Sequence, residues 1–446
     1  MGIDAPPMPA SAGPAAAPGT LRRGLMHPLA LWIAFLLVHF VVGALALEGG
    51  KGLGDVYFVY KPWAQMAAQG TMIVGVNSDW VYPFGALVPV MLALLFGADN
   101  YVGGWLTLVL LVDAAAFATL VVGRDRRRLV AAWWWLGFLL LLGPIAVGRL
   151  DSIAAALAVV GLLWLAVHER AAVVVLTVAT WIKVWPAAVL VAAVVALRSR
   201  WHIVLVAAVT TAVIVAVPLI FGAGLHLLSF ITMQTGRGIQ IEAPVSTFWM
   251  WQAAFHVPGA AVYYDQELIT FQVSGAGTEL AGSLMNPLLA VTCLVVALLG
   301  VRALHRGTPY TRILPELSLA LVTALIAFNK VGSPQYITWL AAPVIIGLVY
   351  QGRGFRTPAI LVLATAGLTQ VVYPFLYDWL LVPDPGMVAV LTVRNLLYFV
   401  ILGWAIGALW RRRHAAEAVG DTVPARVWPF RAPAAVPGAS TREETP

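Results

Sequence analysis

A set of basic side chains in this 446-residue sequence stands apart from the arginines of its short loops. They are Lys51, Lys61, Arg149, Lys183, Arg237, Lys330 and Arg394, and the acids Asp55, Asp151 and Glu242 occur close to some of them along the chain. A charged side chain at or near a bilayer costs free energy unless it is paired with an opposite charge or serves a function. We therefore expect most of these groups to meet in one electropositive pocket that holds a carboxylate base. Such a pocket suits a reaction between a lipid phosphate and a hydroxyl group.

The composition excludes a water-soluble globular protein. Hydrophobic residues make up 61% of the chain and charged residues only 11%, which is too little polar surface to cover a globule. Apolar runs of about 17 to 25 residues recur and match the hydrocarbon core of a bilayer. The sequence therefore predicts an all-α polytopic membrane protein with about eleven to thirteen transmembrane or re-entrant helices. The net charge of +7 lies largely in short loops, so it indicates orientation and not nucleic-acid binding.

The apolar region is flanked by two ends rich in Ala and Pro. We expect residues 1–28 and 411–446 to be disordered cytoplasmic tails. Residues 29–410 form one integral membrane domain with external loops at 48–83 and 222–283. Because arginines of the short loops fall on one side, the positive-inside rule places both termini in the cytoplasm. The expected location is the plasma membrane, with the polar chemistry on its outer face. The single cysteine, Cys293, offers no disulfide framework and no metal site.

The order of the crossings follows from charge parity. The first helix, 29–47, is interpreted as a signal anchor. The short stretch 84–96, interrupted by Pro89, is expected to dip into the outer face and return, because a true crossing there would place the arginines of 124–128 outside. The remaining crossings are expected at 101–122, 131–145, 153–167, 202–221, 286–304, 313–328, 336–350, 359–376 and 388–410, and the run 171–197 is expected to form two half-helices instead of a crossing.

Some residues allow both a structural and a functional interpretation. Lys183 and Pro186 break the run 171–197 into two half-helices, which suits a cavity, although snorkelling of Lys183 is the alternative. Asp55 is either the N-cap of an interfacial helix over 56–69 or a catalytic carboxylate. Arg149 and Asp151 are either a local ion pair in a turn or substrate contacts. Asp113, inside a crossing, is typical of interhelical hydrogen bonding.

The assembled pattern resembles the polytopic GT-C glycosyltransferases, in particular family 87, whose members use polyprenyl-phosphate sugars. The matching residues are Asp55, Tyr60, Ala64, Gly70 and Tyr82-Pro83; Gly148-Arg149-Leu150-Asp151; Lys183 with Pro186; Arg237, Ile239, Gln240, Ile241 and Glu242; and Ser333-Pro334-Gln335-Tyr336 with Trp339. The resemblance covers about residues 30 to 410. The chain departs from the family pattern at Phe84, where a second proline is common, and at Ala243, where a serine is common.

The resemblance implies an inverting glycosyltransferase of the cell envelope with a catalytic first external loop. It would move a sugar, most simply mannose, from a polyprenyl-phosphate carrier to a glycolipid or lipoglycan hydroxyl outside the membrane. Asp55 would be the general base. The donor phosphate would be held by Arg237, Lys183, Arg149 and Lys330, and sugar or acceptor hydroxyls would be bound by Glu242, Gln335, Tyr336, Asp151 and Tyr60. No cofactor and no metal are expected, because the donor is already activated and no metal motif is visible.

Other functions are also compatible with this sequence. Arabinofuranosyl transfer from a polyprenyl-phosphate carrier differs only in the sugar. A transporter or flippase of lipid-linked sugars would also have many helices, a broken helix and buried charges. The lack of a visible internal repeat, and the gathering of polar residues at the outer face, argue against this alternative. A non-catalytic scaffold of envelope assembly is the remaining one.

Overall fold

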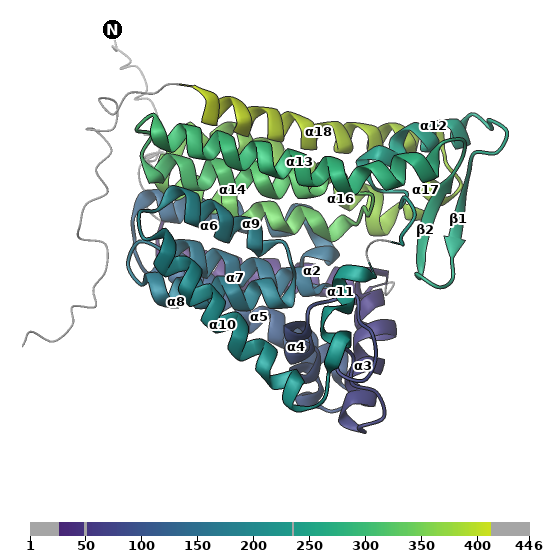
Figure 1. Cartoon of the computed structure of the whole chain (residues 1–446), viewed down its shortest axis with the longest axis horizontal. Helices are drawn as coiled ribbons and strands as arrows, with labels where there is room; N and C mark the ends of the chain where they lie inside the picture. Colours follow the sequence, from purple (N-terminus) through teal and green to yellow (C-terminus); the bar gives the residue numbers. More distant parts are fainter. Residues whose placement is uncertain (1–25, 49–50, 234–235, 412–446) are drawn as a thin grey trace, which may run out of the picture.

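The computed structural model describes residues 26–48, 51–233 and 236–411, and its helices run roughly side by side along one long axis (Figure 1). Eight helical stretches in these ranges are long and apolar enough to cross a membrane. They are Pro28–Leu47, Tyr101–Val121, Arg126–Ala146, Arg200–Ile220, Thr278–His305, Tyr310–Ala327, Pro334–Phe375 and Pro385–Trp410. Shorter apolar helices cover Phe84–Phe96, Leu150–Trp164 and Pro186–Ala196. The chain is therefore a mostly helical, multi-pass membrane protein, as predicted. The expected tails, 1–28 and 411–446, lie almost wholly outside the described residues.

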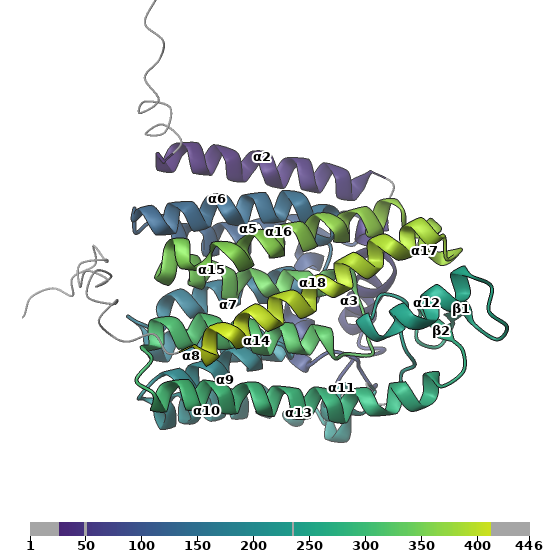
Figure 2. The ribbon, with the colours of Figure 1, turned by 90° about the horizontal axis from the view of Figure 1, so that it is seen from above.

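The N-terminal half of the chain forms the first group of long helices. Its elements are α2 (Pro28–Leu47), α5 (Tyr101–Val121), α6 (Arg126–Leu142), η5 (Gly143–Ala146), α7 (Leu150–Trp164), α8 (Glu169–Ile182), α9 (Pro186–Ala196) and α10 (Arg200–Ile220). Helices α7 and α8 pack closely as neighbours, and α2 lies along α6 at one side of the bundle (Figure 2).

The C-terminal half adds a second group of long helices. Its elements are α13 (Thr278–His305), α14 (Tyr310–Ala327), η8 (Pro334–Leu340), α15 (Ala341–Gln351), η9 (Gly352–Phe355), α16 (Arg356–Gln370), η10 (Val371–Phe375), α17 (Tyr377–Leu381) and α18 (Pro385–Trp410). Helix α14 packs along both α18 and α9, so it joins the two halves.

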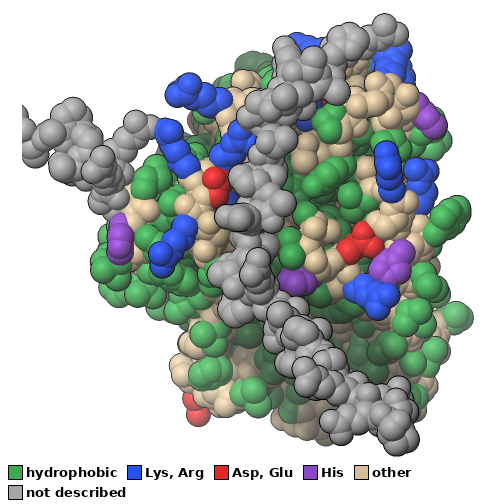
Figure 3. All heavy atoms as spheres, turned by 90° about the vertical axis from the view of Figure 1, so that its left-hand side faces the viewer, with side chains coloured by type: hydrophobic (Ala, Val, Ile, Leu, Met, Phe, Trp, Pro, Cys, Tyr) green, Lys and Arg blue, Asp and Glu red, His purple; other side chains and the backbone are tan. Residues whose placement is uncertain are grey.

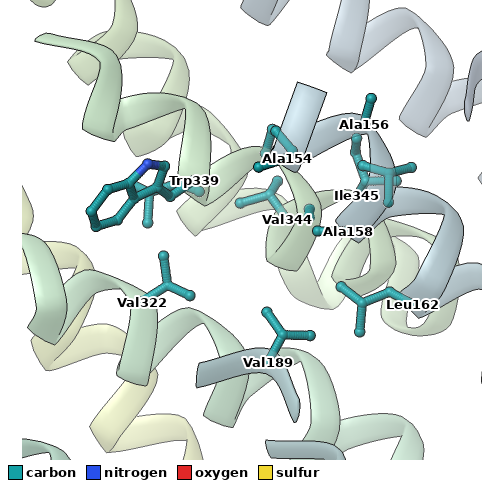
Figure 4. Close-up of a cluster of buried hydrophobic side chains, with 14 of the residues drawn as sticks. Ala154, Ala156, Ala158, Leu162, Val189, Val322, Trp339, Val344 and Ile345 are labelled. Atoms are coloured by element: carbon teal, nitrogen blue, oxygen red, sulfur yellow. The ribbon is translucent and has the colours of Figure 1, made fainter. Parts of the chain in front are cut away.

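Apolar side chains both fill the bundle and cover its outside. In the core, Ala154 and Leu162 of α7 lie among Val189 of α9, Val322 of α14 and Val344 of α15 (Figure 4). On the outside, helices α2, α10 and α13 expose rows of large apolar side chains. Continuous exposed apolar surface of this kind is expected where lipid, and not water, is the solvent.

The connecting segments give the bundle two different ends. The large loops gather at one end, called here the loop end. They contain η1 (Lys51–Leu53), η2 (Val56–Tyr60), α3 (Lys61–Ala68), η6 (Gly224–Leu228), α11 (Ser229–Thr232), η7 (Pro244–Ser246), α12 (Thr247–Ala254) and the antiparallel hairpin of β1 (Ala261–Asp265) and β2 (Thr270–Ser274) (Figure 1). The opposite end, called the basic end, carries many Lys and Arg side chains on its surface (Figure 3). Both predicted loops therefore lie on one side of the bundle.

Several local predictions can be compared with the structure. The stretch η3 (Phe84–Ala86), α4 (Leu87–Leu92) and η4 (Ala93–Phe96) lies beside α3 at the loop end and does not run the length of the bundle, as expected (Figure 1). The β hairpin was not predicted, and α13 begins well before residue 286. Aromatic and β-branched residues in β1 and β2 favour strands. The loop around them shows no clear alternation of apolar and polar residues, so the sequence did not distinguish these strands from coil.

Candidate functional site

A cavity of about 410 Å³ opens at the loop end of the bundle. Its lining combines the broken helix, the second large loop and the segment between α14 and α15. The lining residues are Val81, Tyr82, Pro83, Lys183, Val184, Trp185, Phe230, Ile231, Arg237, Gln240, Asn286, Leu289, Leu325, Asn329, Lys330, Val331, Ser333, Gln335, Tyr336 and Trp339. The cations Lys183, Arg237 and Lys330, which are far apart in the sequence, therefore share one cavity. Arg149 and Arg394, which were expected in the same pocket, do not line it.

Lys183 reaches the cavity because the helix breaks at this residue. Helix α8 ends at Ile182, Lys183 has extended backbone angles, and α9 starts with Pro186, whose fixed φ suits the first turn of a helix. The Lys183 ammonium lies 3.1 Å from Oδ2 of Asp151 and 4.3 Å from the centre of the Tyr82 ring. The prediction of two half-helices meeting near Lys183 is confirmed.

Asp151 lies behind Lys183 and is fully buried. Its Oδ1 accepts a 2.6 Å hydrogen bond from Nε1 of Trp339, and the Trp339 ring stacks on Trp185 with ring centres 5.9 Å apart. The carboxylate is thus held between an indole N–H and the Lys183 ammonium. Asp151 acts from behind the cavity wall and does not line the cavity itself, so it orients Lys183.

Arg237 and Lys330 are brought together by the packing of the second loop against the segment that follows α14. The backbone N–H of Gln240 donates a 3.0 Å hydrogen bond to the carbonyl of Lys330. Within the described ranges, Nε of Arg237 is buried without a hydrogen-bond partner. Burial lowers the pKa of Lys330, and the positive charge of Arg237 lowers it further. The charges of Arg237 and Lys330 therefore repel each other on this wall of the cavity, and an anionic ligand would relieve the repulsion.

Gln335 and Tyr336 provide neutral polar groups beside the cations. The Ser333 hydroxyl donates a 2.6 Å hydrogen bond to Oε1 of Gln335. Tyr336 packs against Trp339 with ring centres 4.2 Å apart. Amide and hydroxyl groups next to aromatic rings are suited to binding a sugar, whose ring has both polar edges and apolar faces.

Asp55 and Arg149 form a second cluster at the same end. Oδ2 of Asp55 lies 3.2 Å from Nε of Arg149, in an ion pair that is not an aligned hydrogen bond. The Arg149 guanidinium also donates to the carbonyls of Gly52 and Gly148, at 3.2 and 3.0 Å, and to the Tyr373 hydroxyl at 3.4 Å. The Asp55 side chain is 30% exposed, whereas that of Arg149 is 7% exposed. Arg149 thus fixes a carboxylate that remains accessible.

The structural interpretations of these residues are wrong in detail. Asp55 makes no capping hydrogen bond to the helix that follows it. Arg149 and Asp151 do not pair with each other, because Arg149 pairs with Asp55 and Asp151 with Lys183. The interhelical role expected of Asp113 is confirmed by a 3.0 Å contact between its Oδ2 and Nε2 of the buried His39.

Tyr60 and Tyr82 connect the two clusters. The Tyr60 hydroxyl accepts a 3.4 Å hydrogen bond from the backbone N–H of Leu150, and its ring centre lies 6.5 Å from that of Tyr82. Burial raises the pKa of both tyrosines. Lys183 opposes this rise at Tyr82, whereas the charges of Asp55 and Asp151 add to it. All these charges act on one hydroxyl group, so the Asp55 cluster and the cavity adjoin.

Glu242 is placed away from the cavity lining. Its carboxylate accepts a 2.7 Å hydrogen bond from Nη1 of Arg394, and its backbone carbonyl accepts one of 2.6 Å from Nη2. Burial raises the pKa of Glu242, and Arg394 opposes this rise. The structure therefore does not bring Glu242 together with the other residues predicted to bind the sugar or the acceptor.

Other lining residues were not predicted from the sequence. Asn286 and Asn329 face the cavity from α13 and from the segment after α14, and Trp185 forms part of its wall. The only sequence feature that could have indicated the two asparagines is the position of each amide side chain at the end of an apolar run. In the described part of the chain, no group of three or more His, Cys, Asp or Glu residues is placed to hold a metal ion.

Comparison with known proteins gives no family for this chain. No protein family matches the sequence, and neither a curated protein nor a solved structure does so.

Proposed function

We propose that the protein is an inverting glycosyltransferase that takes a sugar from a polyprenyl-phosphate carrier and adds it to a hydroxyl group of a glycolipid or lipoglycan. The observation that carries the proposal is the convergence of Lys183, Arg237 and Lys330 on one cavity at the loop end. A mannosyltransferase of the family 87 type is the form of this function that the sequence resembles most. The site would then face the outside of the plasma membrane, where the acceptor is assembled.

The cations support the binding of a donor phosphate. A guanidinium and two ammonium groups in one cavity can contact the oxygens of a phosphodiester and stabilise the charge that develops as it leaves. The buried Nε of Arg237 is a hydrogen-bond donor without a partner in the described residues, so it is available to a phosphate oxygen. The apolar side chains of Phe230, Ile231 and Leu289 in the same cavity would contact the start of a lipid chain. A lipid-linked phosphate fits this combination better than a free anion does.

Asp55 supplies the base in this proposal. The acceptor hydroxyl attacks the anomeric carbon, the bond from that carbon to the phosphate oxygen breaks, and the hydroxyl proton passes to Asp55. Polyprenyl phosphate leaves with the bonding electrons. Arg149 fixes the position of the Asp55 carboxylate, because the Arg149 guanidinium is itself held by the backbone carbonyls of Gly52 and Gly148. No cofactor enters this scheme.

The competing functions differ in what they require of the site. Arabinofuranosyl transfer uses the same groups and differs only in the sugar. A flippase of lipid-linked sugars needs a binding site near the middle of the membrane, between repeated halves. The placement of the cavity among the loop segments favours transfer over transport.

The direct test is transfer of radiolabelled sugar from polyprenyl-phosphate mannose to a membrane lipid extract by the purified full chain. We expect the parent to transfer label and Asp55→Asn to lose about 100-fold or more in kcat, because a positioned base contributes at least that much. Asp79→Asn is the matched control: Asp79 also lies in the first loop, but its 61% exposed side chain contacts His226. Equal transfer by Asp55→Asn and the parent would refute the base assignment. Donor movement across liposomes without any transfer would refute the enzyme class.

A further inference from the structure

A second cavity, of about 260 Å³, lies at the basic end of the bundle, opposite the candidate site. It is enclosed by the start of α14, the end of α15 with η9, the start of α16 and the end of α18. Charged and polar groups that line it are Arg312, Glu316, Gln351 and Arg411. None of the proposed chemistry at the loop end uses these residues. The cavity is below the usual range of about 300 to 1,000 Å³ for whole ligands, so it suits a headgroup.

Two hydrogen-bond donors in this cavity have no protein partner. Nη1 of Arg312 and Nε2 of Gln351 are buried, and neither atom is hydrogen-bonded within residues 26–48, 51–233 and 236–411. A buried donor without a partner is costly, and more so when it carries charge. Both donors line the same cavity, so a ligand with acceptor oxygens would satisfy them together.

The surroundings of the cavity favour an anion. Arg353 and Arg356 are exposed on η9 and at the start of α16, and Arg411 follows the last residue of α18. Arg302 stacks on the ring of Trp410 at 3.7 Å, next to Arg411. Figure 3 shows this end of the molecule with Lys and Arg side chains over its surface. Basic pockets between the ends of membrane-spanning helices lie at the depth of lipid headgroups and bind anionic ones.

The remaining lining specifies more than charge. Glu316 is 5% exposed and places a carboxylate on the wall, which would repel a bare phosphate but accept hydrogen bonds from hydroxyl groups. On α18, Gly403 and Gly407 line the cavity, and a Cβ added at either position would meet no atom within 4 Å. The space is therefore open along one face of α18 and has both an anion-binding and a hydroxyl-binding wall.

From these contacts we infer that the cavity at the basic end binds a phosphate group that carries a hydroxylated substituent, such as the headgroup of phosphatidylglycerol. Arg312 and Gln351 donate to the phosphate oxygens, and Glu316 accepts from the hydroxyl groups. The same chemistry occurs in soluble glycerol phosphates, so the source of the ligand is decided by experiment. The site is separate from the proposed transfer reaction and does not depend on it.

The test measures binding by the purified full chain in phosphatidylcholine nanodiscs or micelles, followed by thermal shift and native mass spectrometry. One arm adds phosphatidylglycerol and the other adds sn-glycerol 3-phosphate. We expect phosphatidylglycerol to bind the parent and Arg312→Gln to weaken this binding about five-fold, the effect of one basic contact to an anionic headgroup. Gly407→Leu, which fills the cavity without removing a charge, should weaken it at least as much.

The control is Arg200→Gln, which removes an exposed charge at the start of α10, outside the cavity lining, and should leave binding within about two-fold of the parent. The unfolding temperatures without added ligand show whether each variant is folded. Tighter binding of glycerol phosphate than of the lipid, with the same sensitivity to both variants, would support the site with a soluble ligand. Binding of either probe that is unchanged in Arg312→Gln and in Gly407→Leu would overturn the inference.

Discussion

The ammonium of Lys183 lies 3.1 Å from Oδ2 of Asp151, and the two side chains are 11% and 0% exposed. Removing one charge of a buried pair leaves the other uncompensated. We therefore expect Asp151→Asn to lower the free energy of unfolding by about 3 to 5 kcal/mol. It should also raise the KM for the donor, because Lys183 loses the group that orients it in the cavity. Thermal unfolding in detergent and donor-dependent transfer rates measure these effects.

The control for this pair is the double variant Asp151→Asn with Lys183→Met. Because both charges are then absent, its loss of stability should be smaller than the sum of the single losses by about 0.5 to 3 kcal/mol. Additive losses would show that the contact contributes nothing to stability and that Asp151 acts through Trp339 alone.

The cations of the candidate site could be predicted from the sequence because charge inside an apolar chain is costly. Lys183, Arg237 and Lys330 stood out for this reason, and the structure brings them to one cavity. The same reasoning predicted the break of the helix at Lys183, since a proline follows three residues later. The positive-inside rule predicted that both large loops lie at one end.

The pairing of these charges could not be predicted, because it depends on helix rotation and on contacts between distant segments. Arg149 is the N-cap residue of α7, and Asp151 lies in its first turn. Residues two apart on a helix do not face each other, so each side chain pairs with a different segment. Glu242 illustrates the same limit. Its partner Arg394 is on the last described helix, and no local pattern joins the two.

The lowered pKa of Lys330 predicts that donor binding weakens at alkaline pH. Burial and the charge of Arg237 lower this pKa, so Lys330 loses its proton at a lower pH than an ordinary lysine, which titrates near about 10.4. Loss of the positive charge weakens the contact with the donor phosphate. We therefore expect the KM for the donor to rise as the pH increases toward this range. Steady-state transfer at a series of pH values measures the effect.

Lys330→Arg provides the matched comparison, because a guanidinium stays charged throughout this range. In Lys330→Arg the rise in KM should occur at higher pH than in the parent. In Lys61→Arg it should occur at the same pH as in the parent, because Lys61 lies in α3 outside the cavity lining. If KM rises at the same pH in the parent and in Lys330→Arg, the rise belongs to a group other than Lys330.

Gly332 is predicted to be essential for the shape of the cavity. A Cβ at this position would collide with backbone atoms of Glu242 and Ala243, which cannot move away as a flexible side chain could. Gly332→Ala should therefore separate the segment after α14 from the second loop. We expect a loss of about 1 to 3 kcal/mol in stability and a higher KM for the donor. In Gly282→Ala, where the new Cβ would only touch Ile239 at 3.6 Å, both quantities should stay near those of the parent.

The last prediction concerns Glu242, which the sequence pattern suggested as a sugar-binding residue. In the structure its carboxylate and its carbonyl both bind Arg394, and the Arg394 guanidinium also donates to Oδ1 of Asn395 at 2.8 Å. Asn395 in turn donates a 2.9 Å hydrogen bond to the hydroxyl of Thr247 on α12. This buried network fastens the second loop to α18, so we expect Glu242 to act on stability and not on sugar binding.

Glu242→Gln should accordingly lower the free energy of unfolding by about 3 to 5 kcal/mol, because it leaves the Arg394 charge buried without a counter-charge. The KM for the donor, measured below the unfolding temperature, should change little. Glu279→Gln, an exposed acid in the first turn of α13, is the control and should leave both quantities unchanged. A residue that binds the sugar would give the opposite pattern, a large increase in KM with the unfolding temperature preserved. That pattern would place Glu242 in the binding site and make its pairing with Arg394 a feature of the ligand-free protein alone.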